Sequence, residues 1–157
     1  MASNYMTKGQ YGRHCEQVRI LEEKISAAKL KVGEAAKLGD LSENAEYDAA
    51  REEVEFLTTR YQEMQAFLVG MQVVDPRRTA PDMVTVGKTV SLRDPNSGEE
   101  LVYNVVGGGW TDAAAREVSY RAPLAAGLIG RRAGDTVEVM VPEGTRTLEI
   151  VSIQPYD

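Results

Sequence analysis

Two stretches of the chain carry hydrophobic residues at alternating spacings of three and four. In the first stretch these positions are Tyr11, His14, Val18, Leu21, Ile25, Ala28, Val32 and Ala35. In the second they are Tyr47, Ala50, Val54, Leu57, Tyr61, Met64, Leu68 and Met71. A spacing that averages about 3.5 residues is typical of helices that wind around each other. We therefore predict two long helices joined along a hydrophobic seam, with His14 as its one polar member.

The connection between the two stretches is short and contains Gly39, Asp40, Leu41 and Ser42. Glycine commonly follows the last residue of a helix because it accepts the left-handed backbone found there. A connection this short makes the two helices antiparallel. Helices of about 30 residues extend on the order of 45 Å at about 1.5 Å per residue. We predict a coiled-coil hairpin over residues 1–75, with an acidic tip at residues 39–47.

The hydrophobic pattern changes after Asp75. Residues 76–82 contain two prolines and no apolar repeat, which indicates a linker. Apolar and polar residues then alternate over five short runs, which predict strands: 84–92, 101–106, 117–121, 136–141 and 147–153. A short helix is expected over residues 123–129. The predicted fold class is α+β, an N-terminal helical hairpin followed by a small, mostly β domain over residues 83–157.

Composition and charge exclude several classes of function. The formal net charge is −6, from 18 Lys and Arg against 24 Asp and Glu, which argues against binding to nucleic acid without a partner. Cys15 and His14 are the only cysteine and histidine, so an intramolecular disulfide and a cysteine-rich zinc site are excluded, and few histidine-based catalytic sites could be built. Gly107 to Gly109 lack the spacing and the lysine of a phosphate-binding loop. Without a signal-like or membrane-spanning run, we expect a cytoplasmic, monomeric protein with no membrane partner.

Polar and acidic residues cluster at the predicted tip: Asp40, Ser42, Glu43 and Glu46. One interpretation is helix capping, because Asp40 and Glu43 have the spacing of a capping box and Ser42 is another favourable cap. The other is a shared metal site, because two carboxylates three residues apart at a helix start can point the same way. Carboxylates suit Mg²⁺, but two are too few for a strong site without ligands from a partner. Both interpretations remain open from the residues alone.

Two segments resemble a known family. Residues 39–52 read GDLSENAEYDAARE, which closely resembles the tip signature of the GreA/GreB transcript cleavage factors. Residues 122–130 read APLAAGLIG, which is similar to the family's Ser-Pro-x-x-Arg-Gly/Ala-Leu-Ile-Gly segment. The domain order also matches, so the resemblance implies an FKBP-like C-terminal domain. It covers nearly the whole chain.

The resemblance implies a mechanism. The β domain would bind at the rim of the secondary channel of bacterial RNA polymerase, and the hairpin would place its tip at the catalytic centre. There it would stimulate the polymerase to cleave backtracked RNA and rescue an arrested complex. The protein itself would not be an independent enzyme. It would bind no cofactor tightly alone, and would share Mg²⁺ with the polymerase.

The resemblance also implies residue roles. Asp40 and Glu43 would be the catalytic, Mg²⁺-assisting pair. Arg51 and Lys37 would contact the RNA 3′ end, although a solvated or ion-paired role for Arg51 is the alternative. The residues that would shape the tip are Leu41, Ser42, Asn44, Glu46 and Tyr47, of which Tyr47 also begins the second repeat and is expected to pack. Those that would dock on the polymerase are Pro123, Leu124, Gly127 and Leu128.

The chain departs from the family pattern at two places. Ala122 and Ala126 stand where the family often has serine and arginine, which could alter the docking surface. Residues 24–33 contain Lys24, Lys29 and Lys31 but lack the family's Arg-Pro stretch, so the grip on extruded RNA is expected to be weaker.

Three alternative functions remain, because a fold does not fix a function. A related polymerase-binding protein could regulate or inhibit through the secondary channel without stimulating cleavage, although the intact Asp40 and Glu43 pair argues against it. A coiled-coil scaffold or dimeriser would explain the repeats but neither matching segment. A peptidyl-prolyl isomerase is suggested only by the FKBP-like resemblance, and the β half has few aromatic residues with which to build its pocket.

Overall fold

The structure is a computed structural model and describes residues 4–38 and 44–157. The described chain forms two compact units. The first, here called the β unit, contains the chain up to Gly12 and again from Met71 to Asp157; the second, here called the hairpin, is Arg13–Gly70. Each is described by itself. No helix in the described part of the chain combines the length and apolar character that crossing a membrane requires.

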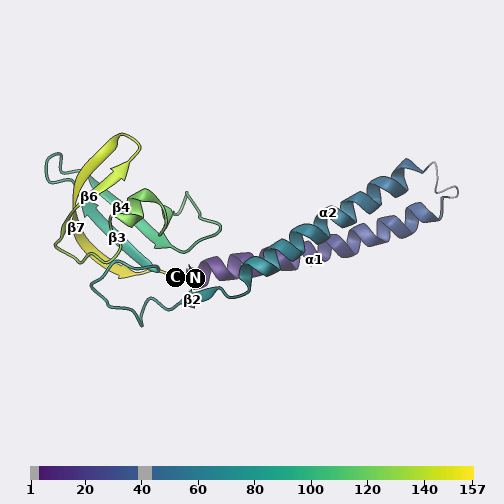
Figure 1. The fold of residues 1–157 in the computed structure, drawn as a ribbon, viewed down its shortest axis with the longest axis horizontal. Coiled ribbons are helices and arrows are strands. Elements are labelled where there is room, and N and C mark those ends of the chain that lie inside the picture. The colour runs from purple at the N-terminus through teal and green to yellow at the C-terminus, as the bar shows by residue number, and fades with distance from the viewer. Residues whose placement is uncertain (1–3, 39–43) are drawn as a thin grey trace. The chain divides into compact units, whose positions relative to one another are not determined.

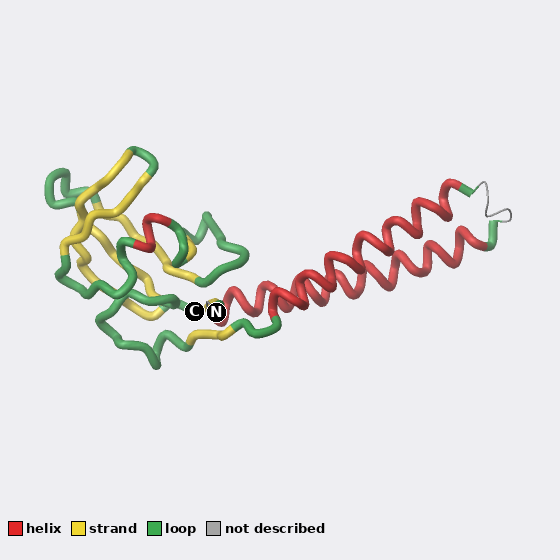
Figure 2. Tube along the Cα trace, viewed as in Figure 1, coloured by secondary structure: helices red, strands yellow, loops and turns green. Residues whose placement is uncertain are grey.

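Two helices make up the hairpin, α1 (Lys8–Ala36) and α2 (Ala45–Leu68), which run alongside each other in Figure 1 and appear red in Figure 2. Leu21, Ala28 and Leu57 are buried between them. The half-buried residues packed against these three are Ile25, Val54, Tyr61 and Met64. All of them belong to the predicted repeats, so the seam is confirmed.

The first member of the first repeat, Tyr11, and the last member of the second, Met71, lie outside the seam. Tyr11 is 36% exposed, and Met71 follows the last residue of α2. Both belong to the β unit. The repeat therefore predicted the middle of the hairpin correctly and extended it too far at its base.

A five-stranded sheet with the order β5-β4-β3-β7-β6 forms the centre of the β unit. Its strands are β3 (Lys88–Arg93), β4 (Glu100–Val106), β5 (Glu117–Ser119), β6 (Thr136–Val141) and β7 (Gly144–Pro155). β4 and β5 are parallel and the other neighbours are antiparallel. The short helix α3 (Pro123–Ala126) packs beside β6. The core holds aliphatic side chains from these elements: Val84, Val90, Leu92, Val105, Ala125, Leu128, Val137, Val139, Leu148 and Ile150.

All five predicted strands and the predicted short helix are present, with shifted ends. The first strand begins at Lys88 rather than residue 84, because Val84 bonds instead to the segment after α3: its N–H donates to Arg131 O at 2.8 Å. The helix ends at Ala126 rather than residue 129. The last strand starts at Gly144, whose φ of 124° favours glycine, and continues to Pro155.

The sequence patterns did not predict a second, two-stranded sheet. In it, β1 (Tyr5–Thr7) pairs in parallel with β2 (Gln72–Val74). Both strands belong to the β unit, so assigning all of residues 1–75 to the hairpin was wrong at its two ends. Parallel pairing joins segments that are distant in the chain, and runs of three residues carry almost no periodic signal.

The predicted linker at residues 76–82 begins as part of the β unit rather than as a free tether. Pro76 is buried, and its carbonyl accepts a 2.9 Å hydrogen bond from Nζ of the fully buried Lys88. Thr79 Oγ1 donates to the same carbonyl at 3.0 Å. A buried ammonium group needs such partners because the loss of its water is costly. The start of the segment is therefore fastened to the sheet.

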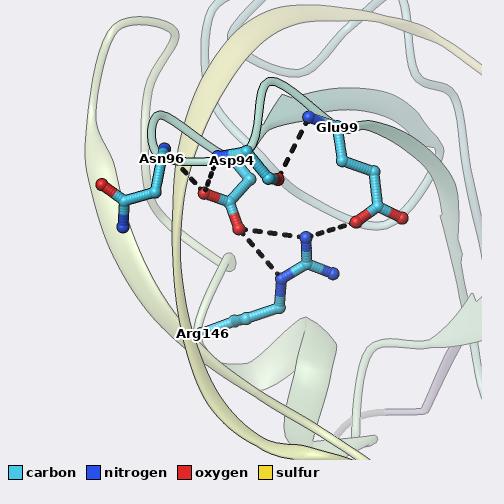
Figure 3. A network of polar contacts seen from close by, with 5 residues as sticks. Asp94, Asn96, Glu99 and Arg146 are labelled. Atoms are coloured by element: carbon cyan, nitrogen blue, oxygen red, sulfur yellow. Dashed lines mark hydrogen bonds and ion pairs between the residues drawn. The ribbon is translucent and has the colours of Figure 1, made fainter.

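The turn between β3 and β4 is closed by a polar network, drawn in Figure 3. Asp94 Oδ1 accepts hydrogen bonds from the N–H groups of Asn96 (2.8 Å) and Ser97 (3.2 Å). Arg146 Nη2 donates to Asp94 Oδ2 at 3.0 Å and to Glu99 at 2.6 Å. The N–H of Asn96 and the Arg146 guanidinium lower the pKa of Asp94. This network therefore stabilises the turn between β3 and β4.

Candidate tip site of the hairpin

The candidate site is the end of the hairpin at which α1 finishes and α2 begins. Asp40, Leu41, Ser42 and Glu43 lie outside the described residues, so their predicted roles remain predictions. The described neighbours are residues 37 and 38, which follow α1, and Asn44, which precedes α2. The site is therefore built from these neighbours and from the first turn of α2.

Asn44 joins the two helices. Its Oδ1 accepts a 3.1 Å hydrogen bond from Tyr47 N, which makes Asn44 the N-cap of α2. Its Nδ2 donates to Ala35 O at 2.8 Å, in the last turn of α1. One side chain thus satisfies a free N–H at the start of one helix and a free carbonyl at the end of the other.

The sequence offers Asp40 and Ser42 as caps, whereas the structure has Asn44 as the N-cap of α2. Asp40, Ser42 and Glu43 lie outside the described residues, so both interpretations of the acidic pair stay predictions.

The first turn of α2 is acidic and exposed. Glu46 and Asp48 lie in it, where carboxylates are favoured by the positive end of the helix dipole. Glu46 also lines an open groove of about 490 Å³ between the two helices. Lys31 Nζ lies 3.7 Å from Glu53 Oε2 along this groove. The other residues lining it are Glu34, Ala35, Leu38, Ala49 and Ala50.

Tyr47 and Arg51, two of the residues with predicted roles at the tip, contact each other in the first turns of α2. The Arg51 guanidinium carbon lies 5.9 Å from the centre of the Tyr47 ring, a cation–π arrangement. Tyr47 is half-buried, which agrees with packing, whereas Arg51 is exposed. Arg51 also shares with Lys29 a groove of about 320 Å³, and its other lining residues are Val32, Val54 and Glu55. This groove joins a basic residue of each helix, a pairing that the sequence patterns did not reveal.

Lys37, the other predicted RNA contact, is exposed just after α1. Its N–H donates to Glu34 O at 3.1 Å, which continues the end of the helix by a tighter turn. The structure does not bring Lys37 into either groove. Its predicted contact with RNA stays a prediction.

The described residues contain no group of three or more His, Cys, Asp or Glu side chains placed to hold a metal ion. The donor chemistry of Asp40 and Glu43 fits Mg²⁺, which is bound by oxygen and commonly takes only one or two protein carboxylates. Ligands from another molecule would be needed to complete such a site. The residues therefore fit a shared ion better than one resident in this chain.

The predicted docking segment is only partly accessible. Pro123 is exposed and Leu124 is half-buried against the core. Leu128 is 0% exposed in the core cluster, so its predicted contact with a partner is wrong. A Cβ on Gly127 would lie 3.0 Å from Glu138 O, which indicates that this glycine serves packing against β6. Ile129, which follows Leu128, reaches the surface and is 38% exposed.

Ile129 borders an apolar groove of about 290 Å³ in the β unit, which the sequence patterns did not predict. It brings together residues from β1, β2, the segment before β3 and the segment around α3. Its lining is Tyr5, Val74, Thr79, Thr85, Val86, Tyr120 and Ile129.

Two family descriptions match the chain. "Transcription elongation factor, N-terminal" matches residues 4–73, and "Transcription elongation factor, GreA/GreB, C-term" matches residues 77–155. Transcription elongation factor GreA of Trichlorobacter lovleyi is 39% identical over 150 residues, 95% of each chain. GreA of Paracoccus denitrificans is 39% identical over 95% of this chain and 96% of its own.

Similar solved structures include the GreA factor homolog 1 (Gfh1) of Thermus thermophilus. It is 24% identical, with a TM-score of 0.44 over 98% of this chain and 99% of its own. A GreA/GreB factor from Nitrosomonas europaea is 29% identical, with a TM-score of 0.44 over 66% of this chain and 90% of its own.

Proposed function

We propose, from the premise that this chain belongs to the GreA/GreB family of transcription elongation factors, that it stimulates RNA polymerase to cleave its own backtracked transcript. The hairpin would enter the secondary channel and bring residues 39–47 to the catalytic centre. The chain would act there as an assisting factor in the cytoplasm and not as an independent enzyme. The RNA 3′ end would be contacted within that complex.

The observation that carries the proposal is the cap supplied by Asn44. Its two hydrogen bonds, with Tyr47 N and Ala35 O, supply the N-cap of α2 and tie it to the last turn of α1. Acidic residues that are not needed to cap a helix are available for other chemistry. The two helices span 29 and 24 residues, or about 44 and 36 Å at about 1.5 Å per residue, so they can carry the tip far from their base.

The role of the acidic pair follows from its donors. Asp40 and Glu43 would supply carboxylate oxygens to a Mg²⁺ ion held mainly by polymerase, and would orient a water toward the RNA phosphate. The chemistry supplied by such an ion is activation of a water and stabilisation of the leaving oxygen. Arg51, held against Tyr47 and beside Lys29, would place positive charge near the RNA backbone.

Docking would be the task of the β unit. Pro123 and Ile129 are exposed, and the apolar groove bordered by Ile129 offers buried area to an apolar side chain of polymerase. Ala126, which stands where the family often has arginine, is exposed beside them. The loss of that charge would leave apolar contact as the larger contribution to docking.

The decisive experiment adds the protein to a backtracked elongation complex and measures release of short 3′ RNA. The variant Asp40→Asn with Glu43→Gln keeps the shape of both side chains and removes their charge. We expect its cleavage rate to fall on the order of 100-fold or more, as when a group that stabilises a transition state is removed. Its affinity for polymerase should stay unchanged.

The matched control is Asp48→Asn with Glu52→Gln, which removes two exposed carboxylates from the start of α2, just beyond residues 39–47. It should retain most of the cleavage activity. If the wild type binds polymerase and stimulates no cleavage, the chain is instead a regulator of the channel. If both double variants behave like the wild type, the carboxylate mechanism is wrong.

A further inference from the structure

The first turn of α1 belongs to the β unit and is capped there by a reciprocal pair. Thr7 N donates to Gln10 Oε1 at 3.0 Å, and Gln10 N donates to Thr7 Oγ1 at 3.1 Å. This is a capping box, in which each side chain satisfies a free N–H of the helix start. Both residues are 0% exposed. The start of the helix that leads to the tip is thus a buried polar site.

Gln10 also bonds beyond its own helix. Its Oε1 accepts a 2.7 Å hydrogen bond from Gly107 N, and its Nε2 donates to Gly107 O at 3.1 Å and to Trp110 O at 3.3 Å. An amide side chain has two donor hydrogens and an oxygen with two lone pairs. With Thr7 N included, Gln10 uses all four. A complete set of buried hydrogen bonds resists displacement, because each unpaired group would be costly.

Gly107 permits this arrangement. A Cβ on Gly107 would lie 1.7 Å from Tyr5 O and 2.3 Å from Met6 Cα, so no side chain fits there. The next residue, Gly108, donates its N–H to Tyr5 O at 3.1 Å. The glycine run that resembles no phosphate-binding loop therefore serves the close approach of β1 and the start of α1.

We propose that Gln10 is a positioning residue for transcript cleavage, locking the first turn of α1 to the loop at residues 107–110. We call this set of hydrogen bonds the latch. The proposal rests on the proposed function. A helix transmits a shift or rotation of its first turn along its length, and α1 runs without a break from Lys8 to Ala36. A misplacement of about 1 Å at a reacting centre can cost on the order of 100-fold in rate.

The primary test variant is Gln10→Glu, which keeps the acceptor oxygen and removes both donors to the carbonyls of Gly107 and Trp110. A second variant, Gln10→Asn, keeps the amide and shortens its reach by one methylene, in case a buried charge prevents folding. The matched control is Gln62→Glu, the same change at an exposed position of α2. In Gln10→Glu the second carboxylate oxygen would face the carbonyls of Gly107 and Trp110 and be repelled by them, and in Gln10→Asn the amide falls short, so the latch should open in both. Hydrogen exchange of the Gly107 N–H should then become faster in both Gln10 variants and stay slow in the control. The exchange of β3 and β7 amides should not change, which separates an open latch from unfolding.

Cleavage by the backtracked complex then separates positioning from a merely structural role. With the latch open, the maximal cleavage rate should fall by about 10-fold or more, while the concentration of protein that gives half the maximal rate changes by less than about 3-fold. An unchanged maximal rate with fast Gly107 exchange overturns the proposal. So does a large rise in the half-maximal concentration at an unchanged maximal rate, because Gln10 would then act in docking.

A crosslinking measurement keeps this proposal distinct from the proposed function. Leu38, 67% exposed beside the tip, is changed to cysteine in a Cys15→Ser chain and carries a photo-crosslinker. The otherwise unaltered chain should crosslink to the catalytic region of polymerase, and the Gln10 variants should lose at least half of that yield at equal occupancy. If the unaltered chain gives no such crosslink, insertion itself fails. If it does and the Gln10 variants match it, the latch has no positioning role.

Discussion

The hairpin and the β unit differ in how many buried side chains hold them together. The seam of the hairpin is narrow: its buried members are Leu21, Ala28 and Leu57, and small alanines such as Ala35 fill much of the rest. The β unit has a broad aliphatic core that draws on most strands of its sheet, on α3 and on the segments around them. Burial of apolar area is the main stabilising contribution in both. The hairpin therefore depends on a few side chains and on its caps, whereas the β unit depends on a larger set of buried side chains.

The difference shows how the two tasks divide. A long, thin hairpin gains reach by leaving most of its side chains in water, including Leu30 and Phe56, which are 71% and 62% exposed. The β unit places its apolar residues in one centre and leaves a smaller apolar groove open at its surface. Changes in the two units should consequently differ in size and in what they disturb.

The largest loss of stability is expected for Leu148→Ala in the core of the β unit. Leu148 is 0% exposed, and removing a fully buried leucine costs about 3–5 kcal/mol. The loss in the free energy of unfolding is measured by chemical denaturation, with hydrogen exchange of the β3 amides as a second measurement. Val151→Ala in the same strand, at 50% exposure, should cost less than about 0.5 kcal/mol. Similar losses from both variants would contradict the assigned core.

A smaller loss is expected for Leu57→Ala in the seam. Leu57 is 9% exposed and lies near the edge of a narrow contact, so its truncation should cost about 2–3 kcal/mol. Helical circular dichroism during thermal unfolding should report the loss, with the exchange of β3 amides unchanged. Phe56→Ala, one residue away and 62% exposed, is the control and should leave the transition nearly in place. A hairpin indifferent to Leu57→Ala would show that the seam does not hold it together.

Next comes the cap at the tip. Asn44→Ala removes both hydrogen bonds of the side chain and should destabilise the start of α2 by about 1–2 kcal/mol. Asn44→Ser retains an acceptor for Tyr47 N and lacks the donor to Ala35 O, so it should recover about half of that loss. The exchange rate of the Tyr47 N–H is the measurement. Equal exchange rates in the wild type and Asn44→Ala would contradict the assignment of Asn44 as the cap of α2. The main support for the proposed function would then be lost.

The smallest effect concerns pH at the base of the hairpin. Burial lowers the pKa of His14, with a further lowering from Arg13, and the ring of Phe67 lies 5.3 Å away. The unfolded chain therefore takes up this proton first, near its usual pKa of about 6.5. The stability contributed by neutral His14 is complete above that pH and is lost as pH falls toward the lower folded pKa.

The hairpin should accordingly melt at a modestly lower temperature at pH 5.5 than at pH 7.5. The variant His14→Gln should lose this difference, and an NMR titration of the His14 ring should give a pKa below that of an unfolded peptide. A His14 pKa above the peptide value would reverse the sign and contradict the prediction.

The sequence patterns predicted most of the helices and strands. Repeats such as Leu21, Ile25 and Ala28 carry the helical period over many turns, so the hairpin could be inferred without coordinates. The alternation of apolar and polar residues in the second half similarly predicted the strands of the β unit. These features depend on neighbours in the chain, which is why pattern alone was enough.

The site was less accessible to such reasoning. Asp40 and Glu43 could be singled out only by composition and resemblance. Asn44, which was expected only to shape the tip, is the N-cap of α2; a cap is fixed by where the helix begins, and boundaries carry a weak signal. Leu128 was expected at a docking surface and lies in the core, since a four-residue helix does not reveal which side it buries.

By itself, the sequence thus determined the two helical repeats, the alternating strands and the acidic segment between the helices. Only the tertiary structure decided that the chain before Gly12 belongs to the β unit, that Gln10 is bonded to Gly107, and that Pro76 is held by Lys88. The reason is sequence distance. Gln10 and Gly107 are separated by 97 residues, and no periodicity reports a hydrogen bond between them.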